Sequence, residues 1–253
     1  MSRVDDGMII PLLYASLFLL PHQMSRPDVE RIDYNQFDDA LDIYLHQRRY
    51  ALAISTIQGN RILDLGCGYG YGTKQMALAH PDKQFDAIDI DPEVITYAKN
   101  HNQLANITYH SMSATELTFD DSSFDTVISI ENIEHIPDDQ AYLAEARRVL
   151  KPQGVFFVTT PNDNRLPHRI KGVFNIPFQY NEFHIREYTP AQLVRALQRN
   201  GFHIEKQQGL YLHLLPRGTR GGRRLSQLPI VYKLLVNHAP FHLASYQCVT
   251  ATK

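Results

Sequence analysis

The chain has few cysteines, almost no net charge and no apolar run of membrane-spanning length. Its 253 residues include only Cys67 and Cys248, which are too far apart to suggest a disulfide framework and fit a reducing, cytoplasmic compartment. No Cys/His spacing is typical of zinc, so we expect no bound metal. The formal net charge of −2 gives no bulk attraction for nucleic acid, and we expect no such partner.

Residues 8–20 are almost wholly apolar, and Pro21 follows them. They are fewer than the ~20 residues that a membrane-spanning helix needs. Asp5 and Asp6 weaken the positive flank of a secretion signal, and no small-residue cleavage site follows. We therefore expect residues 1–24 to be a packed or poorly ordered leader, with a membrane anchor as the alternative.

From Arg61 onward, strand-like and helix-like segments alternate. This alternation predicts a Rossmann-like, doubly wound and mostly parallel α/β sheet with helices on both faces. The expected strands are 61–65, 84–89, 106–110, 124–130, 155–160, 203–212 and 243–252, the expected helices are 73–80, 92–100, 139–150 and 190–200, and a turn is expected at 151–154.

The flanking segments predict a domain organisation. Residues 25–60 read as a helical cap, which could equally be a packing helix, and residues 61–212 form the core. Residues 213–253 hold a basic and apolar insert, followed by the final strand that completes the core sheet. The arginines at 217–224 and the apolar stretch 228–236 raise the hypothesis of a peripheral membrane contact, although a solvated loop is the simpler interpretation. The oligomeric state is left open.

A glycine-rich turn follows the first strand, with glycines at 66, 68, 70 and 72. Glycine lets the backbone turn sharply and approach a ligand closely. Doubly wound sheets bind nucleotide-like cofactors at this place. The carboxylate of Asp64 would repel a pyrophosphate there and attract a cationic ligand. Asp89 closes the second strand, where an acidic residue can accept hydrogen bonds from ribose hydroxyls.

Over about residues 45–210, the chain resembles the class I S-adenosylmethionine-dependent methyltransferases. The motifs that carry this resemblance are Asp64-Leu-Gly-Cys-Gly-Tyr-Gly, Ile88-Asp-Ile-Asp-Pro, Phe124-Asp-Thr-Val-Ile-Ser with Glu134-His, and Ala146-Arg-Arg-Val-Leu-Lys-Pro-Gln-Gly. The resemblance implies S-adenosyl-L-methionine as the cofactor and an antiparallel last strand in a seven-stranded sheet. The segments around His46–Tyr50 and 181–188 look like a subgroup near polysaccharide and glycolipid biosynthesis, and quinone-pathway enzymes look similar over the core.

The resemblance also assigns roles to individual residues. Asp64 would face the methionine amino group, and Asp89 would bind the ribose. Glu131 would lie near the sulfonium. The other residues expected to line the cofactor are Gly66, Cys67 and Gly68 at the methionine and ribose, Ile90 at the adenine, and Ser113 and Ala114 at the border of the base.

The implied reaction moves a methyl group to an oxygen or nitrogen of a small molecule or a glycan or glycolipid acceptor. An alcohol acceptor needs a base, and histidine suits this task near neutral pH. His135 and His184 are the catalytic candidates, although either could be a structural histidine, and Glu131 and Glu134 are weaker ones. Arg49 or Arg186 could bind an acidic group.

Three other functions compete with this interpretation. A nicotinamide-dependent oxidoreductase is disfavoured by Asp64 and by the hairpin-like tail. A non-catalytic module that binds S-adenosylmethionine would keep the cofactor pocket and lack an acceptor site. A nucleic-acid methyltransferase is disfavoured by the near-zero charge, and the segment after the fourth strand lacks an Asn/Asp-Pro-Pro-aromatic motif.

Overall fold

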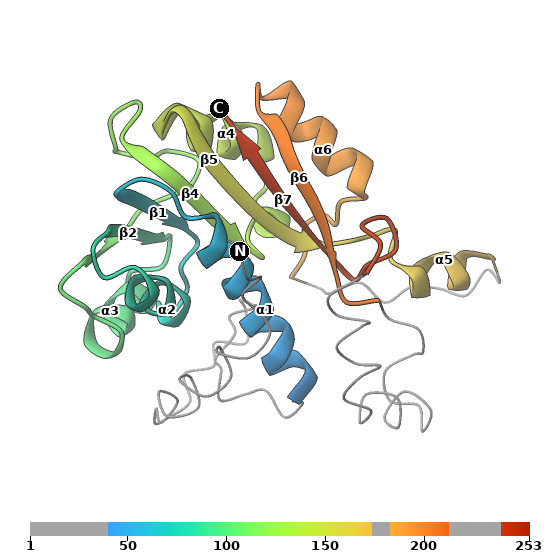
Figure 1. Ribbon diagram of the computed structural model, residues 1–253, viewed down its shortest axis with the longest axis horizontal. Helices are drawn as coiled ribbons and strands as arrows, with labels where there is room; N and C mark the ends of the chain where they lie inside the picture. Colours follow the sequence, from blue (N-terminus) through green and yellow to red (C-terminus); the bar gives the residue numbers. More distant parts are fainter. Residues whose placement is uncertain (1–39, 174–182, 213–238) are drawn as a thin grey trace, which may run out of the picture.

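The computed structural model describes residues 40–173, 183–212 and 239–253, which form a seven-stranded sheet covered by helices (Figure 1). The strand order is β3-β2-β1-β4-β5-β7-β6. β7 runs antiparallel to β5 and β6, and the other neighbours are parallel. The strands are β1 Arg61–Leu65, β2 Gln84–Asp89, β3 Ile107–Ser111, β4 Phe124–Ile130, β5 Leu150–Pro161, β6 His203–Leu210 and β7 Tyr246–Thr252. The predicted Rossmann-like fold is confirmed.

The helices pack on both faces of this sheet, since successive side chains of a strand point to opposite sides. Ile62 joins one apolar cluster with Met76 of α2, whereas Leu63 joins the other with Leu143 of α4 and Leu197 of α6. The helices are α1 Ala40–Thr56, α2 Tyr71–Ala79, α3 Pro92–His101, the 3₁₀ turn η2 Ile133–His135, α4 Asp139–Val149, α5 Leu166–Val173 and α6 Pro190–Arg199.

The predicted bounds hold for β1, β2 and β4, and several others differ. β3 lies one residue later than expected, β6 ends earlier and β7 begins later. α2 begins at Tyr71 because Gly70, in the left-handed conformation, directly precedes it. α5 was not predicted.

The turn predicted at 151–154 lies inside β5. Leu150 pairs with Phe124 and Val155 with Thr126, so residues 151–154 bulge opposite Asp125. Gln153 has a φ of 64° at this bulge, which accounts for the turn-like sequence within a continuing strand.

Several predicted segments lie outside the described residues: the leader 1–24, the beginning of the helical cap at 25–39, and the basic and apolar insert at 213–238. Their predicted roles stay predictions. Among the helices that the structure describes, none is long and apolar enough to cross a membrane.

The glycine turn between β1 and α2 is fastened to the end of β2. The backbone N–H groups of Gly66 and Cys67 both donate to the carbonyl of Ile88, at 3.0 and 2.8 Å. The N–H of Gly68 donates to Oδ2 of Asp89 at 3.1 Å. The turn is therefore held in place by the neighbouring strand.

Two glycines of this turn face different surroundings although both have positive φ. A Cβ on Gly70 (φ 80°) would lie 2.6 Å from the hydroxyl of Tyr109 and 2.9 Å from Cβ of Ala98. A Cβ on Gly68 (φ 53°) would meet nothing within 4 Å. Gly70 is thus needed for packing, whereas Gly68 borders open space.

This difference predicts unequal costs for two alanine variants. Gly68→Ala bears only the left-handed backbone strain and should lower the free energy of unfolding by about 1–2 kcal/mol. Gly70→Ala adds overpacking against Tyr109 and should lower it by about 2–5 kcal/mol. Urea denaturation of the two variants beside the wild type measures both values, and equal losses would contradict this account of the turn.

Candidate cofactor and acceptor site

Asp64 lies at the carboxyl end of β1 with its side chain buried. Its Oδ2 accepts a hydrogen bond of 2.6 Å from the hydroxyl of Thr73 in α2. Burial, with the nearby charge of Asp89, raises the pKa of Asp64 to about 6 despite this bond. A buried acid with a raised pKa is poised to gain from a cationic ligand.

Asp89 ends β2 on the opposite side of the glycine turn. Its two carboxylate oxygens accept from the backbone, Oδ2 from Gly68 and Oδ1 from the N–H of Asp91 at 3.0 Å. Each carboxylate oxygen can accept more than one bond, so ribose hydroxyls can still be bound. Asp89 therefore organises the turn as well as offering acceptors to a ligand.

The residues expected at the adenine form a rim beyond β2 and β3. The side chain of Ile90 is 69% exposed, which leaves an apolar surface for a flat ring. Ser113 is bound to its own loop, because its Oγ contacts the hydroxyl of Thr115 at 2.8 Å. Ala114 is partly buried beside it. The structure thus places Ile90, Ser113 and Ala114 after β2 and β3, as the sequence predicted.

Asn132 explains why Gly66 must be glycine. Its side-chain amide donates to the carbonyl of Leu65 at 3.1 Å, and its side chain occupies the space that a Cβ on Gly66 would need. The hydroxyl of Tyr142 accepts from the same amide at 3.3 Å. The segment after β4 is therefore locked against the end of β1.

Glu131 follows β4 in the left-handed conformation, with a φ of 50°. Its Oε1 accepts from the hydroxyl of Thr159 in β5 at 2.9 Å, and its Oε2 lies 3.8 Å from Nη1 of Arg49 in α1. The guanidinium of Arg49 lies 4.4 Å above the ring of Tyr246. Burial opposes the charge of Arg49, but Glu131 and Tyr246 outweigh it, so the pKa of Arg49 is raised.

Aromatic side chains of α1 cover the glycine turn. The ring of Tyr50 fills the space beside Gly72 and packs edge-on against Tyr71, with 5.6 Å between centroids. His46 is buried, and its Nδ1 lies 3.1 Å from the hydroxyl of Tyr71. Burial, with the nearby charge of Arg49, lowers the pKa of His46 well below its usual value, so this imidazole is neutral.

The two predicted catalytic histidines lie side by side although 49 positions separate them in the sequence. Their ring centroids are 5.1 Å apart in an edge-to-face arrangement. Nδ1 of His135, in η2, contacts the carbonyl of Phe183 at 3.0 Å. Nδ1 of His184 contacts Oε1 of Glu187 at 3.0 Å. A neutral imidazole that donates from Nδ1 carries its lone pair on Nε2, as a base or a ligand must.

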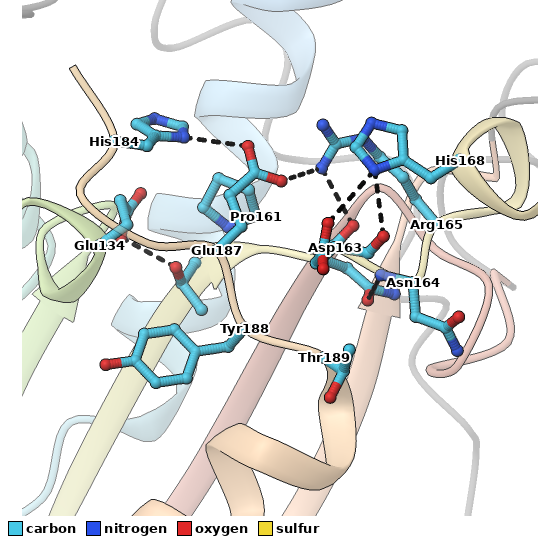
Figure 2. Close-up of polar contacts among 12 residues, drawn as sticks. Glu134, Pro161, Asp163, Asn164, Arg165, His168, His184, Glu187, Tyr188 and Thr189 are labelled. Carbon is cyan, nitrogen blue, oxygen red and sulfur yellow. Dashed lines mark hydrogen bonds and ion pairs between the residues drawn. The ribbon is translucent and has the colours of Figure 1, made fainter. Parts of the chain in front are cut away.

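Two glutamates border this histidine pair, and Figure 2 shows both of them beside His184. Glu134 is fully buried, and its Oε2 accepts from the hydroxyl of Thr160 at 2.8 Å. Burial, with Glu131 nearby, raises the pKa of Glu134 well above its usual value. Glu187 behaves in the opposite way: despite burial, His184 and Arg165 hold its pKa at about 2, so it is ionised.

Several residues of the site were not found from the sequence: Thr73, Tyr109, Asn132, Thr159, Arg165 and Glu187. Most of them act through a partner distant in the chain, and none lies in a local pattern that marks its contact. The two cysteines form no disulfide. Arg186, an expected anion-binding candidate, instead pairs with Asp139 at 2.6 Å.

Comparison with known proteins agrees with this geometry. A family model described as a methyltransferase domain matches residues 57–202, more than half of the chain. A probable S-adenosylmethionine-dependent methyltransferase from Mycolicibacterium smegmatis is 30% identical over 166 residues, which are 66% of this chain and 61% of that one. A ubiquinone biosynthesis O-methyltransferase from Coxiella burnetii is 30% identical over 167 residues, which are 63% of this chain and 70% of that one.

Solved structures share the fold at lower identity. An S-adenosylmethionine-dependent methyltransferase from Mesorhizobium loti is 17% identical, with a TM-score of 0.59 over 85% of this chain and 100% of that one. The [4+2]-cyclase SpnF is 20% identical, with a TM-score of 0.57 over 81% and 80% of the two chains. The fold alone therefore does not fix the reaction. On the family match and the sheet topology together, the chain belongs to the class I S-adenosylmethionine-dependent methyltransferases.

Proposed function

We propose that the protein transfers the methyl group of S-adenosyl-L-methionine to an oxygen of a small-molecule acceptor. The observation that carries this proposal is the pair of carboxylates, Asp64 and Asp89, on either side of a turn whose Gly68 borders open space. Two acids beside an open glycine turn, at the ends of adjacent parallel strands, suit a cationic, ribose-bearing ligand.

In this proposal the cofactor lies across the ends of β1, β2 and β4. Asp64 faces the ammonium of the methionine part, and Asp89 accepts from the ribose hydroxyls. Ile90 packs on the adenine, with Ser113 and Ala114 at its border. Gly66, Cys67 and Gly68 line the middle of the ligand, and Glu131 lies near the sulfonium.

The choice of oxygen as the acceptor atom rests on the relatives. Besides the Coxiella burnetii enzyme, a fatty-acid O-methyltransferase from Mycolicibacterium smegmatis is 25% identical over 164 residues. A nitrogen acceptor, or a glycan or glycolipid, is the alternative.

A scan of cell extract with labelled S-adenosylmethionine, followed by mass spectrometry, identifies the product. Cofactor binding without any labelled product would instead indicate a non-catalytic module.

The chemistry needs alignment and removal of one proton. The sulfonium already activates the methyl group, so holding acceptor and methyl in line can lower the barrier by about 7–11 kcal/mol. An acceptor hydroxyl must also lose its proton. Nε2 of His135 or of His184 is the proposed base, since their Nδ1 atoms are engaged with Phe183 and Glu187.

Replacing Asp89 should separate cofactor binding from folding. Asp89→Ala removes the ribose acceptors and releases the N–H of Gly68, so we expect affinity for S-adenosylhomocysteine to fall by about 100-fold or more. The control is Asp86→Asn on the same strand, where the side chain pairs with Arg61 and His110 instead. Calorimetry on both variants is the measurement, and unchanged affinity in Asp89→Ala would remove the ribose assignment.

The raised pKa of Asp64 predicts a pH-dependent affinity. Above its pKa of about 6 the carboxylate is ionised and attracts the cofactor ammonium, whereas below it the neutral acid does not. Affinity for S-adenosylhomocysteine should fall as the pH is lowered from 7 to 5, and Asp64→Asn should bind weakly with a flatter profile.

The stability of the ligand-free protein should respond in the opposite direction. A folded-state pKa above the unfolded value stabilises the fold most below the unfolded pKa of ~4, and this contribution is lost as the pH rises through about 6. Asp64→Asn should therefore raise the melting temperature relative to the wild type more at pH 8 than at pH 4. A melting-temperature difference between Asp64→Asn and the wild type that is larger at pH 4 than at pH 8 would contradict the raised pKa of Asp64.

A further inference from the structure

Three side chains near the proposed acceptor position point toward one another in a way that suits a metal ion. One ligating atom from each of Glu134, His135 and His184 lies within 4.8 Å of the other two. A divalent cation with bonds of ~2.1 Å holds neighbouring tetrahedral ligand atoms ~3.4 Å apart, so these atoms would approach one another by at most ~1.4 Å on binding. We propose that Glu134, His135 and His184 bind a divalent first-row transition metal ion, although no bound metal was expected from the sequence.

The two imidazoles are already oriented as metal ligands. Metal-binding histidines almost always donate their other ring N–H to a carboxylate or a backbone carbonyl. His184 contacts the carboxylate of Glu187 through Nδ1, and His135 contacts the carbonyl of Phe183 in the same way. A neutral ring that donates from Nδ1 in this way has its lone pair on Nε2. Arg165, which pairs with the other oxygen of Glu187, fixes that carboxylate in turn.

The buried carboxyl group of Glu134 is a second, independent observation that points to a bound cation. Its side chain is fully buried, yet Oε1 has no hydrogen-bond partner among the described residues. Its Oε2 accepts from the hydroxyl of Thr160, and Figure 2 shows the other oxygen turned toward His184. Within the described part of the chain, no arginine or lysine pairs with Glu134. A buried carboxyl without a counter-charge must stay protonated or take up a cation.

A neighbouring group of side chains provides an internal comparison. Asp163, His168 and Glu187 also lie close enough to share an ion. Both oxygens of Glu187, however, are already bound, one to His184 and one to Arg165. The guanidinium supplies the positive charge there and would repel a metal ion. The group around Glu134 lacks such a charge and is the better site.

The donor set indicates the class of metal. Two imidazole nitrogens and one carboxylate oxygen suit zinc, iron, manganese or cobalt rather than calcium. Three protein ligands leave further positions for water or an acceptor oxygen. The role of the ion in methyl transfer rests on the proposed function: an acceptor hydroxyl coordinated to it would have a lowered pKa and would release its proton to solvent. The imidazoles would then be ligands rather than bases.

The test is a titration of the full chain with Mn²⁺, followed by electron paramagnetic resonance, without any acceptor. We expect one Mn²⁺ bound per chain and a rise in melting temperature on its addition. Glu134→Gln should weaken binding at least ~100-fold and lose this rise, and His135→Ala and His184→Ala should do the same. The matched control is His168→Ala, which should bind Mn²⁺ as the wild type does.

Binding of S-adenosylhomocysteine is measured for every variant to show that the variant is folded. If Glu134→Gln does not fold, His135→Ala and His184→Ala provide the test in its place. The inference is overturned if the wild type binds no Mn²⁺ at millimolar concentration, or if His168→Ala loses Mn²⁺ while Glu134→Gln keeps it. Failure of Mn²⁺ binding with intact S-adenosylhomocysteine binding would remove the metal site and leave the proposed methyl transfer standing.

Discussion

The attachment of the glycine turn to the end of β2 is the constraint on which the site depends. Two backbone N–H groups converge on the carbonyl of Ile88, and a third reaches the carboxylate of Asp89. These bonds fix the gap between β1 and β2 before any ligand arrives, so little ordering remains to oppose binding. Asn132 closes the same turn from the side of β4.

The acidic side chains around this turn differ in whether a basic side chain pairs with them, and this difference separates their roles. Asp64 and Glu134 are buried without cationic partners among the described residues, and the pKa of each is raised. Glu131 and Glu187 instead pair with Arg49 and Arg165. The paired acids hold neighbouring side chains in position, whereas the other two are available to a positively charged ligand.

The sequence predicted those features that depend on local chemistry. The bounds of β1, β2 and β4 follow from apolar residues that turn signals interrupt, and the glycine spacing predicted the turn between β1 and α2. The sequence predicted a turn where β5 has a bulge, because a Pro-Gln-Gly segment is typical of both a turn and a β-bulge. Through resemblance, the motifs also led to the seven-stranded sheet and its antiparallel last strand.

Contacts between distant segments could not be read from the sequence. The approach of His184 to His135 depends on how residues after β5 return over β4, and their partners Glu187 and Phe183 have no marking pattern. The pairing of Arg49 with Glu131 joins α1 to β4 in the same way. Such contacts follow from packing, so only a structure reveals them.

The central claim is that a sulfonium cofactor lies across the carboxyl ends of β1 and β2. A crystal structure with S-adenosylhomocysteine tests it most directly. The account predicts the ribose at Asp89, the amino group at Asp64 and the adenine against Ile90. A ligand bound elsewhere, or side chains filling the crevice beside Gly68, would contradict it.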